Sequence, residues 1–323
     1  MPNLAQVSET RGSELGREAL GTLLEASRLL SFLDQQAAFE EDATDYQWRT
    51  YEDEEGVQTR QRGGSYTPED VAPGAPESDT LSFHGDKIDV DHSDHADSER
   101  GLRDIAMWLA KTMRKKVRRF GRGWEQVATG GSADPGAMKG LEEILDGVAN
   151  VAGFGQTMVI DAASWTEADD DHFDLGDETL WGLFIEQLIK VLSELDANGL
   201  LVAPALHARM YTIAQEKHIL GESRDQFGNP VPTFANIPFV PLNPGAITTT
   251  EDNNASPAQA TTTSLYPVRA GEGQLSLVTN SGLEFWDLGD LEGKESNRVK
   301  WELRGQWKIE EEHAARRIRN IKL

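Results

Sequence analysis

Cysteine is absent from the 323-residue sequence. Its absence excludes disulfide bonds, thiol nucleophiles and zinc or iron–sulfur sites held by cysteine. No apolar run approaches the roughly 20 residues that a membrane-spanning helix needs. The first residues also lack the basic start and the apolar block of a secretory signal. These absences predict a soluble protein with no membrane partner.

The sequence motifs of common enzyme families are missing as well. G-x-S-x-G and H-E-x-x-H do not occur, and the seven histidines lie in no triad-like arrangement with serine and aspartate. The glycine-rich stretch 130–140 is not a phosphate-binding loop, because Met138 precedes Lys139 and a glycine follows it. We therefore expect no catalytic residues and no cofactor.

Two acidic segments raise the question of a metal site. Histidines and aspartates are interleaved from His84 to Asp97, but strand periodicity divides them between two faces, and neither face collects an ordinary ligand set. The run from Asp169 to Glu178 lacks the ligand order and the central glycine of an EF-hand. We interpret both as solvated charged segments without a metal. An acidic metal-dependent hydrolase that uses the His/Asp segment is the alternative.

Positive charge is scarce. The chain carries 31 lysines and arginines against 55 aspartates and glutamates, a net charge of −24. Such a surface repels nucleic acid in bulk and resists non-specific association. Apolar residues make up 38% of the sequence, which is enough for a core in one large domain or two moderate ones.

The N-terminal half contains two predicted helices with an acidic segment between them. Apolar residues at helical spacing predict an amphipathic helix over 13–33. The segment 40–97 is rich in acids, glycine and proline, and its alternating stretches at 48–51 and 81–90 predict an extended hairpin with a long tip.

The second of these helices, over 98–124, has the clearest pattern in the chain. Its apolar residues step by three or four positions, and Ser98 is a suitable N-cap. The second half is basic on the other faces, at Lys111, Arg114, Lys115, Lys116, Arg118, Arg119 and Arg122.

The C-terminal half reads as a mixture of strands and helices. Its predicted elements are a helix at 179–195, a strand at 200–204, a helix at 206–217, a strand at 234–240, a polar loop at 244–264 and two strands within 283–309. In the last strand, apolar Val299, Trp301 and Leu303 alternate with polar residues, which is the period of a half-buried strand. The tryptophans of this region are expected in the core.

This ending resembles the C-terminus of HK97-fold major capsid proteins of tailed bacteriophages. The matching positions are Trp301, Gly305, Ala314, Ala315, Arg316, Ile318, Asn320 and Ile321. The order of the earlier parts is similar too: an arm, an extended hairpin, a long helix, Gly140-Leu141, the strand Leu200–Pro204 and Ile237-Pro238. Asn236 stands where the family has glycine, and asparagine tolerates the left-handed conformation.

The resemblance implies an α+β chain with the HK97-like capsid fold. Its expected parts are an N-terminal arm (1–45) that latches onto neighbours, an E-loop (46–97) lying across the adjacent subunit, a peripheral domain (98–195) with its spine helix (98–124), an axial domain (196–282), and C-terminal strands that return to the peripheral domain (283–323).

The function implied by the resemblance is structural. The chain is expected to assemble into the hexamers and pentamers of an icosahedral phage head that encloses double-stranded DNA without sequence specificity. Expected partners are a separate scaffolding protein, a portal protein and cement proteins. The expected location is the virion, after assembly in the host cytoplasm. An encapsulin-like nanocompartment shell is the alternative within the same fold.

The candidate interface residues are charged. We expect the basic face of the long helix to pair with acidic segments of a neighbouring subunit; contact with DNA and plain solvation are the alternatives. The candidates are Lys111, Arg114, Lys115, Arg118, Arg119 and Arg122, with Glu40, Glu41, Glu52 and Asp53 opposite them. Leu323 is expected to pack in the shell, and truncation of 314–323 to impair assembly more than secondary structure.

Overall fold

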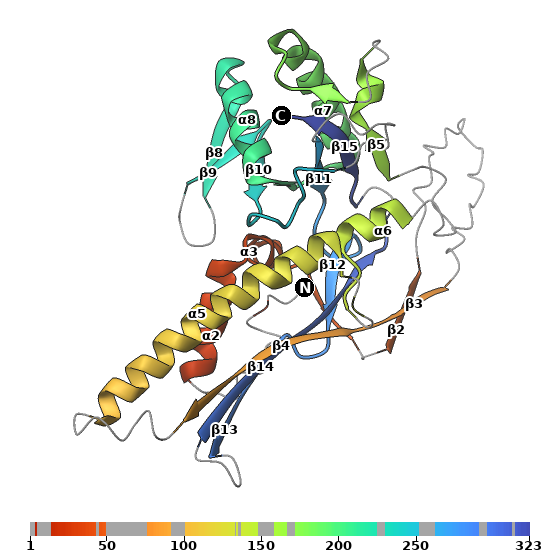
Figure 1. Ribbon diagram of the computed structural model, residues 1–323. Coiled ribbons are helices and arrows are strands. Elements are labelled where there is room, and N and C mark those ends of the chain that lie inside the picture. The colour runs from red at the N-terminus through yellow and green to blue at the C-terminus, as the bar shows by residue number, and fades with distance from the viewer. Residues whose placement is uncertain are drawn as a thin grey trace, which may run out of the picture.

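A computed structural model shows two large sheets, one in each half of the molecule, with a long helix running along the first of them (Figure 1). The described residues are 4, 14–42, 45–49, 76–91, 101–132, 134, 137–147, 158–166, 172–224, 230–251, 262–290, 296–311 and 314–323.

The first sheet is built around its longest strand. It contains β1 (Phe39–Glu41), β4 (Ser82–Asp91), β12 (Leu275–Thr279), β13 (Leu283–Asp290) and β14 (Ser296–Ile309). Trp301 of β14 is opposite Phe285 of β13 and also opposite Asp86 of β4, so β14 lies between these two strands. A short hairpin, β2 (Asp45–Arg49) with β3 (Pro76–Thr80), precedes β4.

The predicted strand, turn and long second strand near the C-terminus are confirmed by β13 and β14. Trp301 is fully buried and Trp307 nearly so, as expected of core residues, whereas Trp286 is half-buried beneath Lys300. The indole Nε1 of Trp307 donates a hydrogen bond of 2.7 Å to the carbonyl of Ala128. This bond fixes the first sheet to the long helix.

The long helix, α5, spans Gly101–Gly130. The predicted helix is confirmed, but it ends six residues later than expected, because the two glycines at 121 and 123 do not stop it. Gly131 stops it instead, with a φ of +80° that suits a helix C-terminus. Gly121 has its own role: a Cβ there would lie 3.0 Å from Leu23, so glycine lets the N-terminal helix approach closely.

The predicted helix over 13–33 is two helices, α2 (Glu14–Ala26) and α3 (Arg28–Gln35). The break falls at Ser27, whose side chain accepts a hydrogen bond from the Leu30 N–H and so caps α3. Both helices pack on their own chain, with Leu23 and Leu29 buried. Residues 14–42 of the predicted arm are therefore part of the core of this subunit.

The second sheet forms the other half of the molecule. Its strands are β5 (Val159–Asp161), β6 (Phe173–Asp174), β7 (Gly199–Val202), β8 (Leu220–Arg224), β9 (Pro230–Phe234), β10 (Ile237–Pro241), β11 (Thr262–Val268) and β15 (Arg317–Lys322). Helices η3 (Glu178–Leu180), α7 (Trp181–Leu195) and α8 (Pro204–Glu216) lie beside it, and α6 (Leu141–Gly147) and η2 (Ala162–Trp165) contact β15. The Asp177 side chain accepts a hydrogen bond from the Thr179 N–H and caps the start of the helical segment before α7.

Two predictions for this half need correction. The expected strand 234–240 is a hairpin, in which β9 turns into β10 through Ala235 and Asn236, at φ values of 51° and 70°. Asn236 stands where the HK97 family has glycine, and it has the left-handed conformation predicted for that position. The expected polar loop 244–264 ends earlier, because residues from 262 onward belong to the fully buried strand β11.

The boundaries of the expected segments do not coincide with those of the two sheets. Within 283–323, β13 and β14 join the first sheet, whereas β15 lies between β5 and β11 in the second. Helix α7, in the expected segment 98–195, packs against β11. β15 is an interior strand with Ile318 and Ile321 fully buried, so we expect removal of 314–323 to unfold the second sheet as well as to impair assembly.

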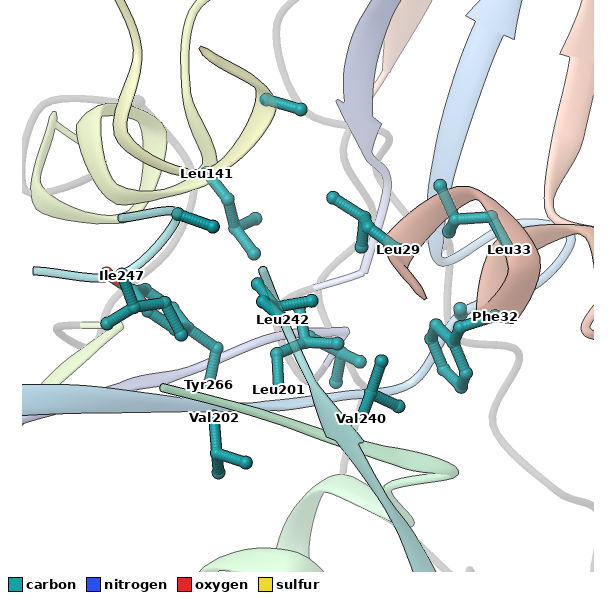
Figure 2. Packing of buried hydrophobic residues seen from close by; sticks show 14 of the residues in the cluster. Leu29, Phe32, Leu33, Leu141, Leu201, Val202, Val240, Leu242, Ile247 and Tyr266 are labelled. Carbon is teal, nitrogen blue, oxygen red and sulfur yellow. The ribbon is translucent and has the colours of Figure 1, made fainter. Parts of the chain in front are cut away.

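The hydrophobic core joins the two sheets through α3. Figure 2 shows Leu29 and Phe32 of α3 near Val240 and Leu242. Val240 belongs to β10 of the second sheet, and Leu242 directly follows that strand. Buried residues of both sheets belong to one cluster. This continuity means that the loss of either sheet exposes apolar surface on the other.

Candidate subunit interface

The basic face of α5 is partly used within the chain. The Arg114 side chain forms an ion pair with Glu18, and Arg118 Nη2 lies 3.6 Å from Glu25 Oε2. Both acids are on α2, so these two predicted interface cations hold α2 along α5. The pairs are largely exposed, and each therefore contributes little stability.

The other four predicted cations, Lys111, Lys115, Arg119 and Arg122, are exposed. None of them forms an ion pair with a carboxylate in the part of the chain that the structure describes. Their positions leave them available to an external partner, which is the property that an interface requires.

The predicted acidic partners are divided. Glu40 accepts hydrogen bonds from Ser276 Oγ at 2.8 Å and from Lys308 Nζ at 2.6 Å, so it serves the first sheet of its own subunit. Glu41 is exposed. Glu52 and Asp53 lie outside the described residues.

A groove of about 690 Å³ separates β4 from α5. The strand contributes Phe83 to Asp86, and the helix contributes Lys116, Arg119, Phe120, Gly123, Trp124 and Val127. Lys116 Nζ donates to the carbonyl of Lys87 at 2.8 Å and lies 3.9 Å from Asp86 Oδ1. The groove therefore combines aromatic walls with cationic groups.

Two side-chain nitrogen atoms of residues that line the groove are buried and have no hydrogen-bond partner among the described residues. They are Trp124 Nε1 and His84 Nε2. Trp124 is 2% exposed. Burial lowers the pKa of His84, which favours its neutral form.

Glu125 joins three parts of the fold. Its Oε2 accepts hydrogen bonds from Ser27 Oγ at 2.8 Å and from the Leu29 N–H at 3.3 Å, and its Oε1 accepts one from the Asn243 N–H. The side chain is fully buried. Burial raises the pKa of Glu125, and the hydrogen bonds it accepts offset part of that rise. This carboxyl group ties α3 and the segment after β10 to α5.

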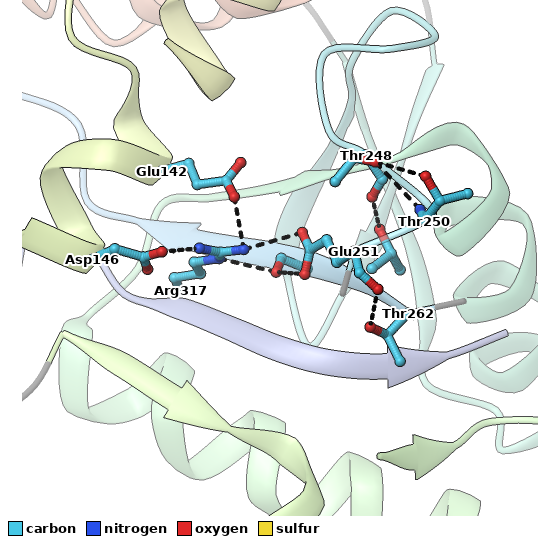
Figure 3. Close-up of polar contacts among 9 residues, drawn as sticks. Glu142, Asp146, Thr248, Thr250, Glu251, Thr262 and Arg317 are labelled. Atoms are coloured by element: carbon cyan, nitrogen blue, oxygen red, sulfur yellow. Dashed lines mark hydrogen bonds and ion pairs between the residues drawn. The ribbon is translucent and has the colours of Figure 1, made fainter. Parts of the chain in front are cut away.

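Arg317 is the centre of a second polar cluster (Figure 3). Its guanidinium lies 2.9 Å from Glu142 and 3.2 Å from Glu251, pairs also with Asp146, and donates from Nε to Ser264 Oγ at 3.0 Å. The contact with Glu251 Oε1 is an ion pair without hydrogen-bond alignment. The cluster fastens α6 and the isolated bridge at 251 to β15, which makes its role structural.

Sequence reasoning missed this cluster, Glu125 and the groove. Glu125 lies next to the apolar stripe of α5, and only its position beside Trp124 signals burial. Arg317 lies in a basic segment after a buried Ala-Ala pair, and nothing in that pattern separates it from Arg316 and Arg319. The groove depends on contact between distant segments, so no local pattern contains it.

A metal or membrane role finds no support in the described residues. No group of three or more histidine, cysteine or acidic side chains comes together there in a way that would hold a metal ion. Of the predicted His/Asp segment, residues 92–97 lie outside the described part. No described helix has the length and apolar character to cross a membrane.

No family model matches the sequence, and no curated protein gives a significant match to it. Solved structures, in contrast, match along most of the chain. The SrpI encapsulin complex from Synechococcus elongatus PCC 7942 is similar with 13% sequence identity and a TM-score of 0.54, over 88% of this chain and 85% of the other.

Two further structures are similar over comparable lengths. The capsid of an empty GTA particle has 12% identity and a TM-score of 0.55, over 90% of each chain. The Microbacterium phage Oxtober96 structure has 12% identity and a TM-score of 0.50, over 87% of this chain and 89% of the other. The chain thus has the fold of HK97-type capsid proteins, as its sequence resemblance predicted.

Proposed function

We propose that this protein is a structural major capsid protein that assembles into an icosahedral phage head enclosing double-stranded DNA. The observation that carries the proposal is the extent of the fold match: shell proteins are similar over nearly the whole of both chains. A match of that extent covers 87–90% of this chain, so the fold as a whole, rather than one part of it, supports a shell role. Because fold alone does not determine function, the charge pattern gives the second argument.

The charge distribution supports assembly through specific contacts. Four exposed cations of α5 have no described acidic partner, while the chain as a whole carries a net charge of −24. Subunits of such charge repel one another in bulk, so local complementary patches decide which faces meet. We propose that Lys111, Lys115, Arg119 and Arg122 face acidic segments of a neighbouring subunit in hexamers and pentamers.

The proposal of a phage head also implies what the shell contains, which proteins it binds and where it is found. Double-stranded DNA is held without sequence specificity, since a chain with a net charge of −24 repels nucleic acid in bulk. A scaffolding protein, a portal protein and cement proteins are the proposed partners. The proposed location is the virion, with assembly in the host cytoplasm.

An encapsulin-like nanocompartment shell is the second candidate. Its support is the similarity to the SrpI encapsulin at a TM-score of 0.54. The two candidates share the subunit contacts and differ in what the shell contains. The third alternative, a metal-dependent hydrolase, gains nothing from these neighbours.

Expression of the chain alone and with the other proteins of its genomic neighbourhood tests the proposal. Negative-stain microscopy of the purified material should show uniform closed shells. Nuclease-protected DNA inside them supports the phage head, and an enzyme cargo without DNA supports the encapsulin-like shell. A small monodisperse monomer under all conditions contradicts both.

A further inference from the structure

A cavity of about 110 Å³ lies between α3 and the second sheet, on the side of β8, β9 and β10. Helix α3 contributes Phe32 to its lining, and β10 contributes Phe239 and Val240. Figure 2 shows Phe32 close to Val240. Two further lining residues are joined by a hydrogen bond of 3.5 Å, from Gln35 Nε2 to the carbonyl of Arg224. The cavity is therefore bounded by the second sheet and by the helix that joins the two sheets.

The enclosed part of this cavity is apolar. Its three buried side chains, Phe32, Phe239 and Val240, are at most 7% exposed. The strands also contribute Pro232, Pro238 and Pro241 to the lining. Proline has no backbone N–H, so these positions cannot donate a hydrogen bond to an occupant. The part of an occupant that enters the cavity is therefore expected to be apolar.

The charged groups of the lining are all positive. Arg28 of α3 and Arg224 of β8 line the cavity, and no lining residue is a carboxylate. Arg28 is exposed and forms no ion pair with the described residues. Burial and the charge of Arg28 lower the pKa of His207, whose ring centroid lies 5.2 Å from that of Phe239. In a chain with a net charge of −24, an arginine without a described counter-ion beside a cavity indicates an anionic ligand.

The volume limits the size of the occupant. One water-sized group needs roughly 10–15 Å³ of such space, so 110 Å³ holds about seven to eleven of them. This space is too small for a helix or strand of a partner protein and large enough for a short unbranched chain. A carboxylate is the head group that fits best, because the N–H donors of a guanidinium can pair with both of its oxygens.

We propose that the cavity between α3 and β10 binds an unbranched acyl carboxylate of roughly eight carbons. The carboxylate pairs with the guanidinium of Arg28, and the acyl chain lies between Phe32 and Phe239. The proposal goes beyond the proposed function and does not depend on it, because all the lining residues belong to one subunit.

Calorimetric titration of the full-length protein with octanoate tests the binding. Octylamine has the same chain with a positive head group, and we expect it to bind at least about tenfold more weakly because Arg28 repels it. From hexanoate to octanoate, the Kd should fall about fourfold for each added CH₂ group that becomes buried. It should not fall further at dodecanoate, whose chain exceeds the cavity. Equal affinity for octanoate and octylamine, or no binding of octanoate, overturns the proposal.

Arg28→Gln tests the role of the head group. The loss of a charge-assisted hydrogen bond should raise the Kd for octanoate about tenfold or more, whereas uncharged octanol should bind the variant and the wild type equally. Arg122→Gln is the matched control, because it removes another exposed arginine that lies on α5 and outside the cavity lining. Both variants should keep the wild-type unfolding temperature without ligand. An unchanged Kd in Arg28→Gln, or an equal loss in Arg122→Gln, contradicts the assignment of Arg28.

An octanoate that carries a photoreactive diazirine at the end of its chain locates the site. Peptides that contain 28–35 and 231–241 should be labelled, and excess octanoate should suppress the labelling. Labelling in the groove between β4 and α5, or spread along the chain, shows unspecific apolar binding and overturns the proposal. Closed shells without octanoate binding would leave the proposed function standing. Octanoate binding by a protein that forms no shell would leave the ligand proposal standing.

Discussion

Replacement of Arg317 by alanine should lower the free energy of unfolding, because it leaves a buried acid without its counter-ion. Arg317 has a side chain only 6% exposed, and it lies 3.2 Å from Glu251, whose side chain is 7% exposed. The other two acids of the cluster, Glu142 and Asp146, are 28% and 42% exposed. In the variant these two can rehydrate, whereas Glu251 cannot.

The expected loss follows from that difference. Removal of one partner from a buried ion pair costs about 3–5 kcal/mol, because the other charge is left uncompensated. The two half-exposed acids add little. We therefore expect Arg317→Ala to lower the free energy of unfolding by about 3–4 kcal/mol at pH 7. The double variant Arg317→Ala with Glu251→Gln should recover a large part of this loss.

The loss should depend on pH in a definite direction. Burial raises the pKa of Glu251 above 4.5, and Arg317 partly offsets that rise. The stability linked to a raised carboxyl pKa is fully present below the unfolded value and is lost as pH rises through the folded value. Without Arg317 the pKa of Glu251 rises further, so the deficit of Arg317→Ala should be largest near pH 7 and should shrink towards pH 5.

Urea unfolding of unassembled subunits, followed by tryptophan fluorescence, measures both effects. The slope of the unfolding free energy against urea concentration must be the same in the wild type and the variants if their midpoints are to be compared as stabilities. A loss below about 1 kcal/mol at pH 7, the level of an exposed pair, refutes the reasoning. So does a deficit that grows as the pH falls.

Three further predictions concern the frame of the subunit. Trp307→Phe removes the hydrogen bond to α5 and should cost about 1–2 kcal/mol in urea unfolding; an unchanged midpoint contradicts it. A Cβ at Gly140 would lie 2.0 Å from Gly131 N, so Gly140→Ala should cost more than about 2 kcal/mol, whereas Gly21→Ala, in open space on α2, should not destabilise the subunit. Deletion of 314–323 removes β15 and should abolish hydrogen-exchange protection in β11; retained protection would show that the second sheet survives without it.

Local periodicity predicted the elements whose pattern is strong. The alternation at Trp301 and Leu303 predicted β14, and the apolar stripe at 98–124 predicted α5. Local periodicity did not predict the helix boundaries that depend on contacts with distant residues. The break at Ser27 is stabilised by Glu125 from another helix, and a single-helix pattern across 13–33 contains no sign of that contact.

The candidate interface could be predicted only in part. Charge clustering identified the basic face of α5, but it could not tell Arg114, which pairs with Glu18, from Arg119, which forms no ion pair with the described residues. Glu40 was grouped with external partners although Lys308, 268 residues away in sequence, neutralises it. Pairings over such separations depend on the assembled sheets and leave no local signal.

Electron microscopy of the purified full-length protein tests the central claim most directly. The account predicts closed shells of uniform diameter built from hexamers and pentamers, in which the long helix and both sheets of each subunit can be traced. A protein that stays monomeric at high concentration, alone and with candidate scaffolding proteins added, would contradict the account.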